Sequence, residues 1–240
     1  MKPTSLLFVM VWIGVAVSAQ AQSTFQNLNF ESANLSNPSG QFNEIPIANA
    51  LPGWSGSIGG VPVTQVWAND YSLGQASIDI FGPTWNAINP GIIDGNYTVF
   101  LQSGGSPVTE GLLVNTSLWQ SGTIPADAQS LQFKAWSFQS GGSLSVSFAG
   151  NSLSPVVLSS GESPSGQPYN VYGADITPYA GQTGQIDFTS IIQGLNWMEL
   201  DDITFSTTAV PEPSTLALIV TGGMAFGARC WRKHGKVTPL

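Results

Sequence analysis

The stretch QSLQFKAWSF, residues 129–138, alternates apolar and polar side chains. Three apolar side chains fall on one face of it, namely Leu131, Phe133 and Ala135. The opposite face carries an amide, a cation and an indole, namely Gln132, Lys134 and Trp136. Because successive side chains of an extended chain point to opposite sides, this pattern predicts a β-strand with one face against a hydrophobic core.

The same alternation recurs on both sides of this strand. It is found in NYTVFLQ (residues 96–102), SLSVSFAG (residues 143–150) and GQIDFTS (residues 184–190). Turn sequences rich in glycine separate these stretches, and no amphipathic helix of useful length is present between residues 22 and 208. Many short strands between such turns predict an all-β fold, in which two antiparallel sheets pack as a sandwich.

Charge is distributed unevenly between the middle of the chain and its ends. Between residues 22 and 209, Lys134 is the single cation against 13 acidic residues, a net charge of −12. This surface excludes nucleic acid as a partner, because nucleic acid is itself polyanionic, and it favours divalent cations. His234 and Cys230 lie near the C-terminus, so the middle contains neither residue type. Disulfides, Ser-His or Cys-His catalysis and histidine-ligated zinc are therefore excluded from it.

The first 21 residues have the layout of a secretory signal peptide. Lys2 precedes an apolar run at residues 6–17, and an A-x-A sequence ends at Ala21. The alternative is a membrane anchor or a buried helix, but the run is too short to span a bilayer. We expect signal peptidase to release an exported chain that begins near Gln22.

The C-terminus combines three features in a fixed order. Pro211, Glu212 and Pro213 come first, followed by an uncharged run at residues 215–228. As a helix this run is about 21 Å long, so it spans a hydrocarbon core of about 30 Å only with help from flanking residues or local thinning. Cations follow at once and hold that end on the cytoplasmic side, namely Arg229, Arg232, Lys233 and Lys236. The alternative is a C-terminal core helix with a basic cap, although the run has no polar face.

This order of features resembles the PEP-CTERM sorting signal of Gram-negative bacteria over residues 209–236. The resemblance implies that the tail inserts transiently in a membrane as a short hydrophobic helix. It also implies removal of the tail near Pro-Glu-Pro by an exosortase, a membrane protease-transpeptidase. Proteins with this tail are associated with exopolysaccharide, so the cell envelope or the extracellular biofilm matrix is the expected location.

Residues 22–208 show a second resemblance, carried by five segments in order. These are NLNFES (27–32), LPGWS (51–55), DGNYTVFLQ (94–102), LWQSGTIPADAQSLQFKAWSF (118–138) and NWMELDDITFS (196–206). The series resembles the galactose-binding-like jelly rolls, which include many carbohydrate-binding modules, and it implies a single jelly-roll domain. Residues 61–93 match nothing in that pattern.

The second resemblance also implies a structural calcium ion. Family members hold it with a carboxylate after the first strand and another in the last strand, which match Glu31 and either Asp201 or Asp202. The apolar pattern slips by one residue between Leu200 and Ile203, which predicts a β-bulge at the two aspartates. The open alternative is a solvated acidic strand end, in which one aspartate accepts hydrogen bonds from backbone N–H groups.

Trp136 is the main candidate for contact with a sugar. It shares a strand face with Lys134 and Gln132, and a flat aromatic ring beside a cation and an amide suits the apolar face and hydroxyl edge of a sugar. Trp85 and Trp119 are further candidates. The open alternative is that a loop carrying Trp85 or Tyr71 covers this face.

Three functions follow from these observations. The favoured one is a non-catalytic polysaccharide-binding module of the exopolysaccharide matrix, with no cofactor other than structural calcium. The second is a structural or adhesive matrix protein without a defined sugar site. The third is a glycan-active hydrolase, which needs two carboxyl groups about 5–10 Å apart. Because 13 acids between residues 22 and 209 make chance pairs frequent, no enzyme is expected.

Overall fold

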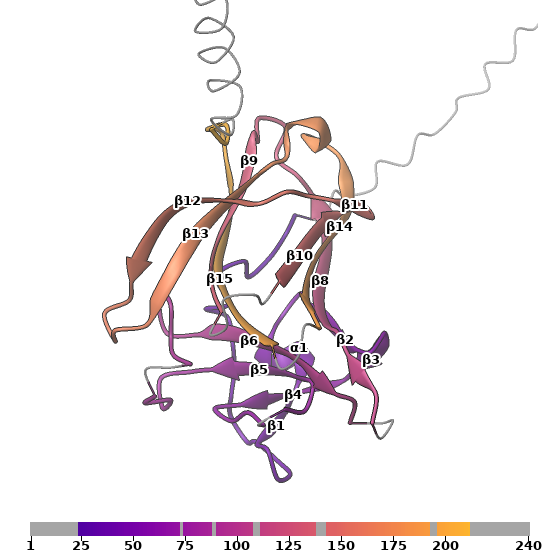
Figure 1. Cartoon of the computed structure of the whole chain (residues 1–240), viewed down its shortest axis with the longest axis vertical. Coiled ribbons are helices and arrows are strands. Elements are labelled where there is room, and N and C mark those ends of the chain that lie inside the picture. Colours follow the sequence, from indigo (N-terminus) through magenta and orange to yellow (C-terminus); the bar gives the residue numbers. More distant parts are fainter. Residues whose placement is uncertain are drawn as a thin grey trace, which may run out of the picture.

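A computed structural model describes residues 24–72, 74–87, 90–107, 111–137, 143–192 and 196–211 (Figure 1). The predicted signal peptide with Ala21, and the sorting tail from Glu212 onward, lie outside these ranges. Within them, no helix is long and apolar enough to cross a bilayer.

Strands are the main regular element of the described residues, and helix is scarce. The short helical elements are α1 (Ile47–Ala50) and the 3₁₀ helix η1 (Thr177–Tyr179). The strands are β1 (Glu44–Pro46), β2 (Ser55–Ile58), β3 (Val61–Val63), β4 (Gln65–Ala68), β5 (Ser77–Phe81), β6 (Thr98–Gly105), β7 (Leu113–Val114), β8 (Thr116–Thr123), β9 (Ser130–Trp136), β10 (Ser143–Phe148), β11 (Asn151–Ser152), β12 (Val156–Glu162), β13 (Pro168–Asp175), β14 (Thr183–Ile191) and β15 (Asn196–Ser206).

Two sheets pack face to face, which confirms the predicted sandwich (Figure 1). The long sheet has the order β1-β4-β5-β6-β15-β9-β13-β12, with β7 beside β6, and the short sheet has the order β11-β10-β14-β8-β2-β3. Between β6 and β15 the chain passes back and forth between the two sheets, as in a jelly roll. The strands concerned are β6-β15-β9-β13 in the long sheet and β8-β14-β10-β11 in the short sheet. One detail differs from the prediction, because β4 and β5 are parallel and the long sheet is therefore mixed.

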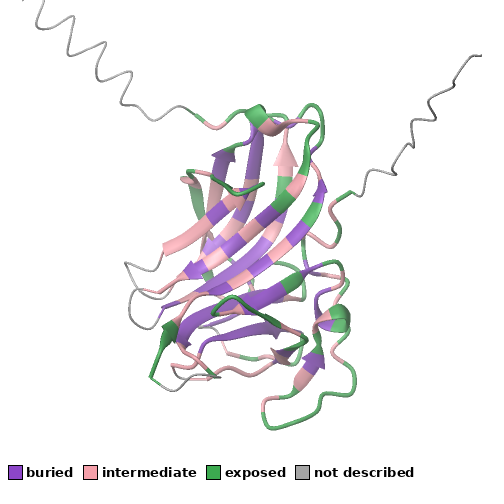
Figure 2. Cartoon of the chain, turned by 90° about the vertical axis from the view of Figure 1, so that its right-hand side faces the viewer, coloured by how far each residue is buried: buried purple, intermediate pink, exposed green. Residues whose placement is uncertain are grey.

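The core between the sheets is built by the predicted alternation. Leu131, Phe133 and Ala135 of β9 are buried, and Phe148 and Phe188 face them from the short sheet. Buried residues alternate with half-buried ones along several strands in Figure 2. Burying each large apolar side chain contributes roughly 1.5–3 kcal/mol, so hydrophobic burial stabilises this sandwich in the absence of disulfides.

The last strand, β15, contains the predicted bulge. Its register against β9 shifts between Asp201 and Thr204, and Asp202 adopts the left-handed conformation with φ 46°. The bulge resets the alternation, so Leu200 and Ile203 both reach the core although they are three residues apart.

The outer face of the long sheet is covered, which the alternation did not predict. Thr98, Phe100 and Gln102 of β6 point away from the core, yet all three are buried. The described residues between β5 and β6, 82–87 and 90–97, fold over this face. It places the Trp85 ring in a stack on Phe81, with 4.5 Å between ring centroids. The strand β6 is therefore enclosed on both sides.

Candidate functional site

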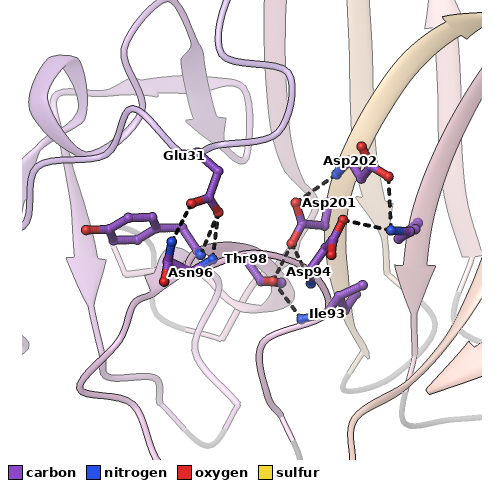
Figure 3. Close-up of polar contacts among 9 residues, drawn as sticks. Glu31, Ile93, Asp94, Asn96, Thr98, Asp201 and Asp202 are labelled. Carbon is purple, nitrogen blue, oxygen red and sulfur yellow. Dashed lines mark hydrogen bonds and ion pairs between the residues drawn. The ribbon is translucent and has the colours of Figure 1, made fainter. Parts of the chain in front are cut away.

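The predicted acidic residues meet in one small pocket, which we call the acidic pocket. Glu31 approaches it from the N-terminal segment, Asp94 from the turn before β6, and Asp201 and Asp202 from the bulge of β15 (Figure 3). The pocket has a volume of about 140 Å³ and is completed by Asn29 and Gly95. Sequence reasoning missed Asp94, whose signal was the Asp-Gly turn.

Glu31 is bound to the turn before β6. The backbone N–H groups of Asn96 and Tyr97 donate to Oε1 at 2.8 and 3.0 Å, and the side chain of Asn96 donates to Oε2 at 2.9 Å. Gly95 has φ 55°, and a Cβ there would overlap the Glu31 carboxylate. The close approach of Glu31 therefore requires glycine at this position.

Asp201 is also satisfied by donors of the protein. Its Oδ2 accepts hydrogen bonds from the Thr98 hydroxyl at 2.6 Å and from the Asp94 N–H at 3.2 Å (Figure 3). Its Oδ1 accepts from the N–H of Asp202 at 2.7 Å. Burial raises the pKa of Asp201 well above its ordinary value.

Lys134 supplies the positive charge in this region. Its Nζ lies 2.7 Å from Asp94 Oδ2 and 3.0 Å from Asp202 Oδ2, and 5.5 Å from the centre of the Tyr169 ring. Burial alone would lower the pKa of Lys134, but its hydrogen bonds to the two aspartates raise it above the ordinary value. The ammonium group therefore remains charged and is committed to this ion-pair cluster.

This arrangement does not fit a calcium ion, which takes six to eight oxygen ligands. The carboxylates of Glu31 and Asp201 accept protein hydrogen bonds, and Asp94 and Asp202 are both paired with Lys134. Among the residues that the structure describes, no group of three or more acidic, histidine or cysteine side chains is arranged to hold a metal. Calcium binding stays a prediction from sequence that the geometry does not support.

Thermal unfolding in calcium and in chelator tests this point. Because the donors and Lys134 already satisfy the carboxylates, we expect the same melting temperature in both. A rise of several degrees in calcium, abolished by Glu31→Gln, would restore the sequence-based assignment, since a bound ion stabilises the folded state by linkage.

The predicted sugar-contact residues of β9 do share one face, but they do not form an open platform. Lys134 is held by the acidic pocket, and the side chain of Gln132 donates to the Ser130 hydroxyl at 3.1 Å. Trp136 is half-buried and lies beside Glu199 of β15 in the sheet register.

The two further tryptophan candidates lie elsewhere. Trp85 stacks on Phe81, and its indole N–H donates to the Pro90 carbonyl at 2.8 Å, so it anchors residues 82–97 to the outer face of the long sheet. Trp119 is on β8 of the short sheet, opposite Asp187 of β14. Trp119 and Trp136 therefore lie on different sheets, and the structure does not bring the five predicted residues into one site.

A larger cavity, of about 500 Å³, lies beyond the ends of β4 and β5, and we call it the amide groove. Among the described residues, its walls carry amides, hydroxyls, prolines and apolar side chains, and no charged residue. They are Ala33, Asn34, Leu35, Ser36, Pro38, Asn43, Ala68, Asn69, Pro83, Thr84 and Tyr97. Its volume is within the range of about 300–1,000 Å³ that is typical of small-molecule sites.

Backbone geometry fixes the two asparagines that flank this groove. Asn43 and Asn69 both adopt the left-handed conformation, with φ 53° and 52°. The carbonyl of Asn43 accepts from the Ala68 N–H at 3.2 Å. The side chain of Asn69 accepts from the Gly82 N–H at 2.7 Å and donates to the Thr84 hydroxyl at 2.8 Å. The Asn69 side chain thereby joins the end of β4 to the start of residues 82–97.

Gly82 permits the two walls of the amide groove to meet. A Cβ there would lie 2.8 Å from Leu35 Cδ1 and 2.9 Å from Tyr97 Cε1, closer than packed carbon atoms normally approach. Within the described part of the chain, neither the Asn43 side-chain amide nor the Tyr97 hydroxyl has a hydrogen-bond partner. These groups are available to a ligand in the groove.

Sequence reasoning missed the amide groove because its residues come from separate segments between residues 33 and 97. Much of that stretch, residues 61–93, matched no known pattern. The available signal was the density of asparagines near glycines and prolines, which marks turns and also supplies hydrogen-bonding groups without charge.

Comparison with protein families matches residues 209–233 to the PEP-CTERM protein-sorting motif, which confirms that prediction. The motif indicates an exported protein that is sorted to the cell envelope or surface and processed by an exosortase. No curated protein matches the chain.

Two solved structures resemble the fold distantly. One is the enzymatically active domain of bacteriophage CBA120 tailspike protein 4, with 13% identity and a TM-score of 0.39 over 77% of this chain and 21% of the tailspike. This chain therefore spans about a fifth of the tailspike chain. The other is TmCBM61 in complex with β-1,4-galactotriose, with 15% identity and a TM-score of 0.36 over 78% of this chain and 99% of the module. Neither likeness is close enough to assign a function.

Proposed function

We propose that this protein, exported and sorted through its PEP-CTERM motif, is a non-catalytic polysaccharide-binding protein of the exopolysaccharide matrix, and that it binds through the amide groove. The observation that carries the proposal is the lining of that groove. Sugars offer hydroxyl groups that donate and accept hydrogen bonds, together with an apolar ring face. Sugar hydroxyls are complemented by the amides of Asn34 and Asn43 and by the hydroxyl of Tyr97. The apolar ring face is complemented by Pro38 and Pro83.

The lining also argues for binding over catalysis. Glycoside hydrolysis requires two carboxyl groups at the scissile bond. None of the described residues that line the groove is a carboxylate, so they supply no general acid, base or nucleophile of that kind. The acids buried elsewhere in the long sheet are enclosed, with Asp79 and Glu199 at 0% exposure and Asp201 at 1%.

The remaining steps of the proposal concern the route of the protein. Signal peptidase removes residues 1–21, the tail inserts in the inner membrane of a Gram-negative bacterium, and the exosortase cleaves near Pro211. Only four residues separate the end of β15, at Ser206, from Pro211. The folded domain is thus close to the membrane until the tail is removed.

Affinity electrophoresis of the full-length protein in a panel of polysaccharide gels tests the binding site. The double variant Asn43→Gly with Tyr97→Phe removes two free polar groups, while glycine accepts the left-handed backbone and phenylalanine keeps the packing on Gly82. Losing two hydrogen bonds worth about 0.5–1.5 kcal/mol each predicts affinity roughly 5- to 150-fold weaker.

Asn49→Ala is the matched control, because Asn49 is an exposed asparagine on α1 that does not line the groove. Its mobility should equal that of the wild type. Trp136→Ala compares the two candidate surfaces. Loss of retardation in Trp136→Ala with the double variant unaffected would place the site on β9 and refute the groove, provided that both variants keep the wild-type melting temperature.

A further inference from the structure

We propose that the amide groove accepts only uncharged glycan chains, and that the protein discriminates against anionic polysaccharides such as uronates and sulfated glycans. The inference rests on the proposed function and names the ligand class of the same site. It derives from the placement of the charges in the described residues.

The lining of the groove offers nothing to offset the charge of an anionic sugar. A carboxylate or sulfate that enters a site loses hydration, and the loss is offset only by a positive charge or by several directed donors. The groove contains no lysine, arginine or histidine. Its free donors, at Asn34, Asn43 and Tyr97, are neutral amide and hydroxyl groups, which match the uncharged hydroxyls of a sugar.

The one cation of the sandwich is already engaged by the protein. Between residues 22 and 209 the sole lysine or arginine is Lys134. It lies 2.7 Å from Asp94 Oδ2 and 3.0 Å from Asp202 Oδ2, and its side chain is only 19% exposed. Lys134 does not line the groove, and pairing it with a ligand anion would leave two aspartates without a counter-charge. No cation in this region is therefore free to bind an anionic sugar.

The net negative charge of the domain also repels a polyanion before it reaches the groove. Lys134 stands against 13 acidic residues between positions 22 and 209. Repulsion of a polyanion by such a surface extends over a Debye length of about 10 Å at 0.1 M salt. Anionic chains are thus disfavoured both on approach and inside the groove, whereas a neutral chain experiences neither effect.

Matched polymers that differ only in charge provide the test. Hydroxyethylcellulose and carboxymethylcellulose share one backbone, as do methyl-esterified and de-esterified polygalacturonate, and neutral galactan, mannan and dextran complete the panel. We expect at least one neutral gel to retard the full-length protein with little change between 50 and 500 mM salt. We expect affinity at least 10-fold weaker for the charged member of any pair in which the neutral member binds.

A gain-of-function variant tests the cause. Thr84→Lys places one cation at the wall of the amide groove, where Thr84 is exposed. This variant should be retarded by the charged polymer, and the retardation should disappear as the salt concentration rises. Ser121→Lys is the control, because Ser121 is exposed on β8 and remote in sequence from the groove residues. It should gain no retardation. Absence of any gain in Thr84→Lys would contradict the charge argument.

The outcomes separate the two proposals. If no polymer retards the wild type, the proposed function fails. If carboxymethylcellulose or de-esterified polygalacturonate retards it as strongly as the neutral partner, polysaccharide binding stands and the inference of neutral selectivity is overturned. Each gel is run with calcium and with chelator, and retardation by a charged polymer in calcium alone would also overturn it, because a bridging cation would then supply the missing charge.

Discussion

Asp79→Asn and Glu199→Gln are each expected to raise the melting temperature at pH 8 and to have little effect near pH 4. Both residues are fully buried, and each lies opposite the buried Phe100 of β6 in the sheet register. The Asp79 Oδ2 accepts from the Ser77 hydroxyl at 2.6 Å, and the Glu199 Oε1 accepts from the Gly91 N–H at 2.7 Å. In the described part of the chain, Asp79 Oδ1 and Glu199 Oε2 have no hydrogen-bond partner.

The direction of the effect follows from proton linkage. Burial raises the pKa of Asp79 and of Glu199 well above the ordinary values, which are about 3.9 and 4.3 in an unfolded chain. Above about pH 4 the unfolded chain has released protons that the folded chain still holds. The free energy of unfolding therefore falls as pH rises, by up to about 1.4 kcal/mol per pH unit for each group, until the folded pKa is reached.

Nearby acidic residues raise the two pKa values further, and the nearby lysine is paired with other aspartates. The negative charge of Asp70 raises the pKa of Asp79 further, and that of Asp201 raises the pKa of Glu199. Burial also raises the pKa of Asp201 itself. Lys134 is held by Asp94 and Asp202. The wild type should therefore be most stable under mildly acidic conditions.

Calorimetry from pH 4 to pH 8 measures these effects. A neutral isostere removes the cost of ionising a buried group, so we expect each variant to gain about 1–3 kcal/mol at pH 8, or roughly 3–10 °C. Asp127→Asn, at an exposed position, is the control and should leave the pH profile unchanged. A wild-type melting temperature that rises steadily up to pH 8, or isosteres that destabilise at pH 8, would contradict the enclosed outer face.

Lys134→Met is expected to destabilise the sandwich by about 1–3 kcal/mol at neutral pH, or roughly 3–10 °C in melting temperature. This loss of stability lies between those typical of exposed and of buried ion pairs. The Lys134 side chain is 19% exposed, whereas its partners Asp94 and Asp202 are 49% and 35% exposed. Methionine keeps the length and apolar stem of lysine but leaves the nearby aspartates to repel one another.

A double-mutant cycle with Asp202→Asn isolates the ion pair. Asparagine tolerates the left-handed conformation of residue 202, so the backbone of the bulge is preserved. The two substitutions together should cost less than the sum of their separate effects, with a coupling of at least 0.5 kcal/mol. Strict additivity would show that the Lys134–Asp202 contact contributes nothing, and a stabilising Lys134→Met would contradict the role given to the acidic pocket.

Local sequence pattern predicted the parts of the fold that it controls directly. The alternation in β9 placed Leu131, Phe133 and Ala135 in the core, because one buried face imposes a period of two. The slip between Leu200 and Ile203 predicted the bulge, because an extra residue is the means by which a strand resets that period.

The pattern did not show what covers the other face of each strand. Lys134 and Trp136 were correctly placed on the outer face of β9, but the approach of Asp94, 40 residues earlier in the chain, converts that face into an ion-pair cluster. The amide groove was missed for the same reason. It is assembled by loops whose contacts are long-range, and their residues carry no periodicity.

The most direct measurement of the central claim is the position of a bound sugar. A crystal structure of the protein should be determined with an oligosaccharide prepared from whichever neutral polymer retards it in electrophoresis. We predict that the sugar occupies the amide groove and makes hydrogen bonds with Asn43 and Tyr97. Density for the sugar over Trp136 or Trp119, with the groove empty, would contradict this account.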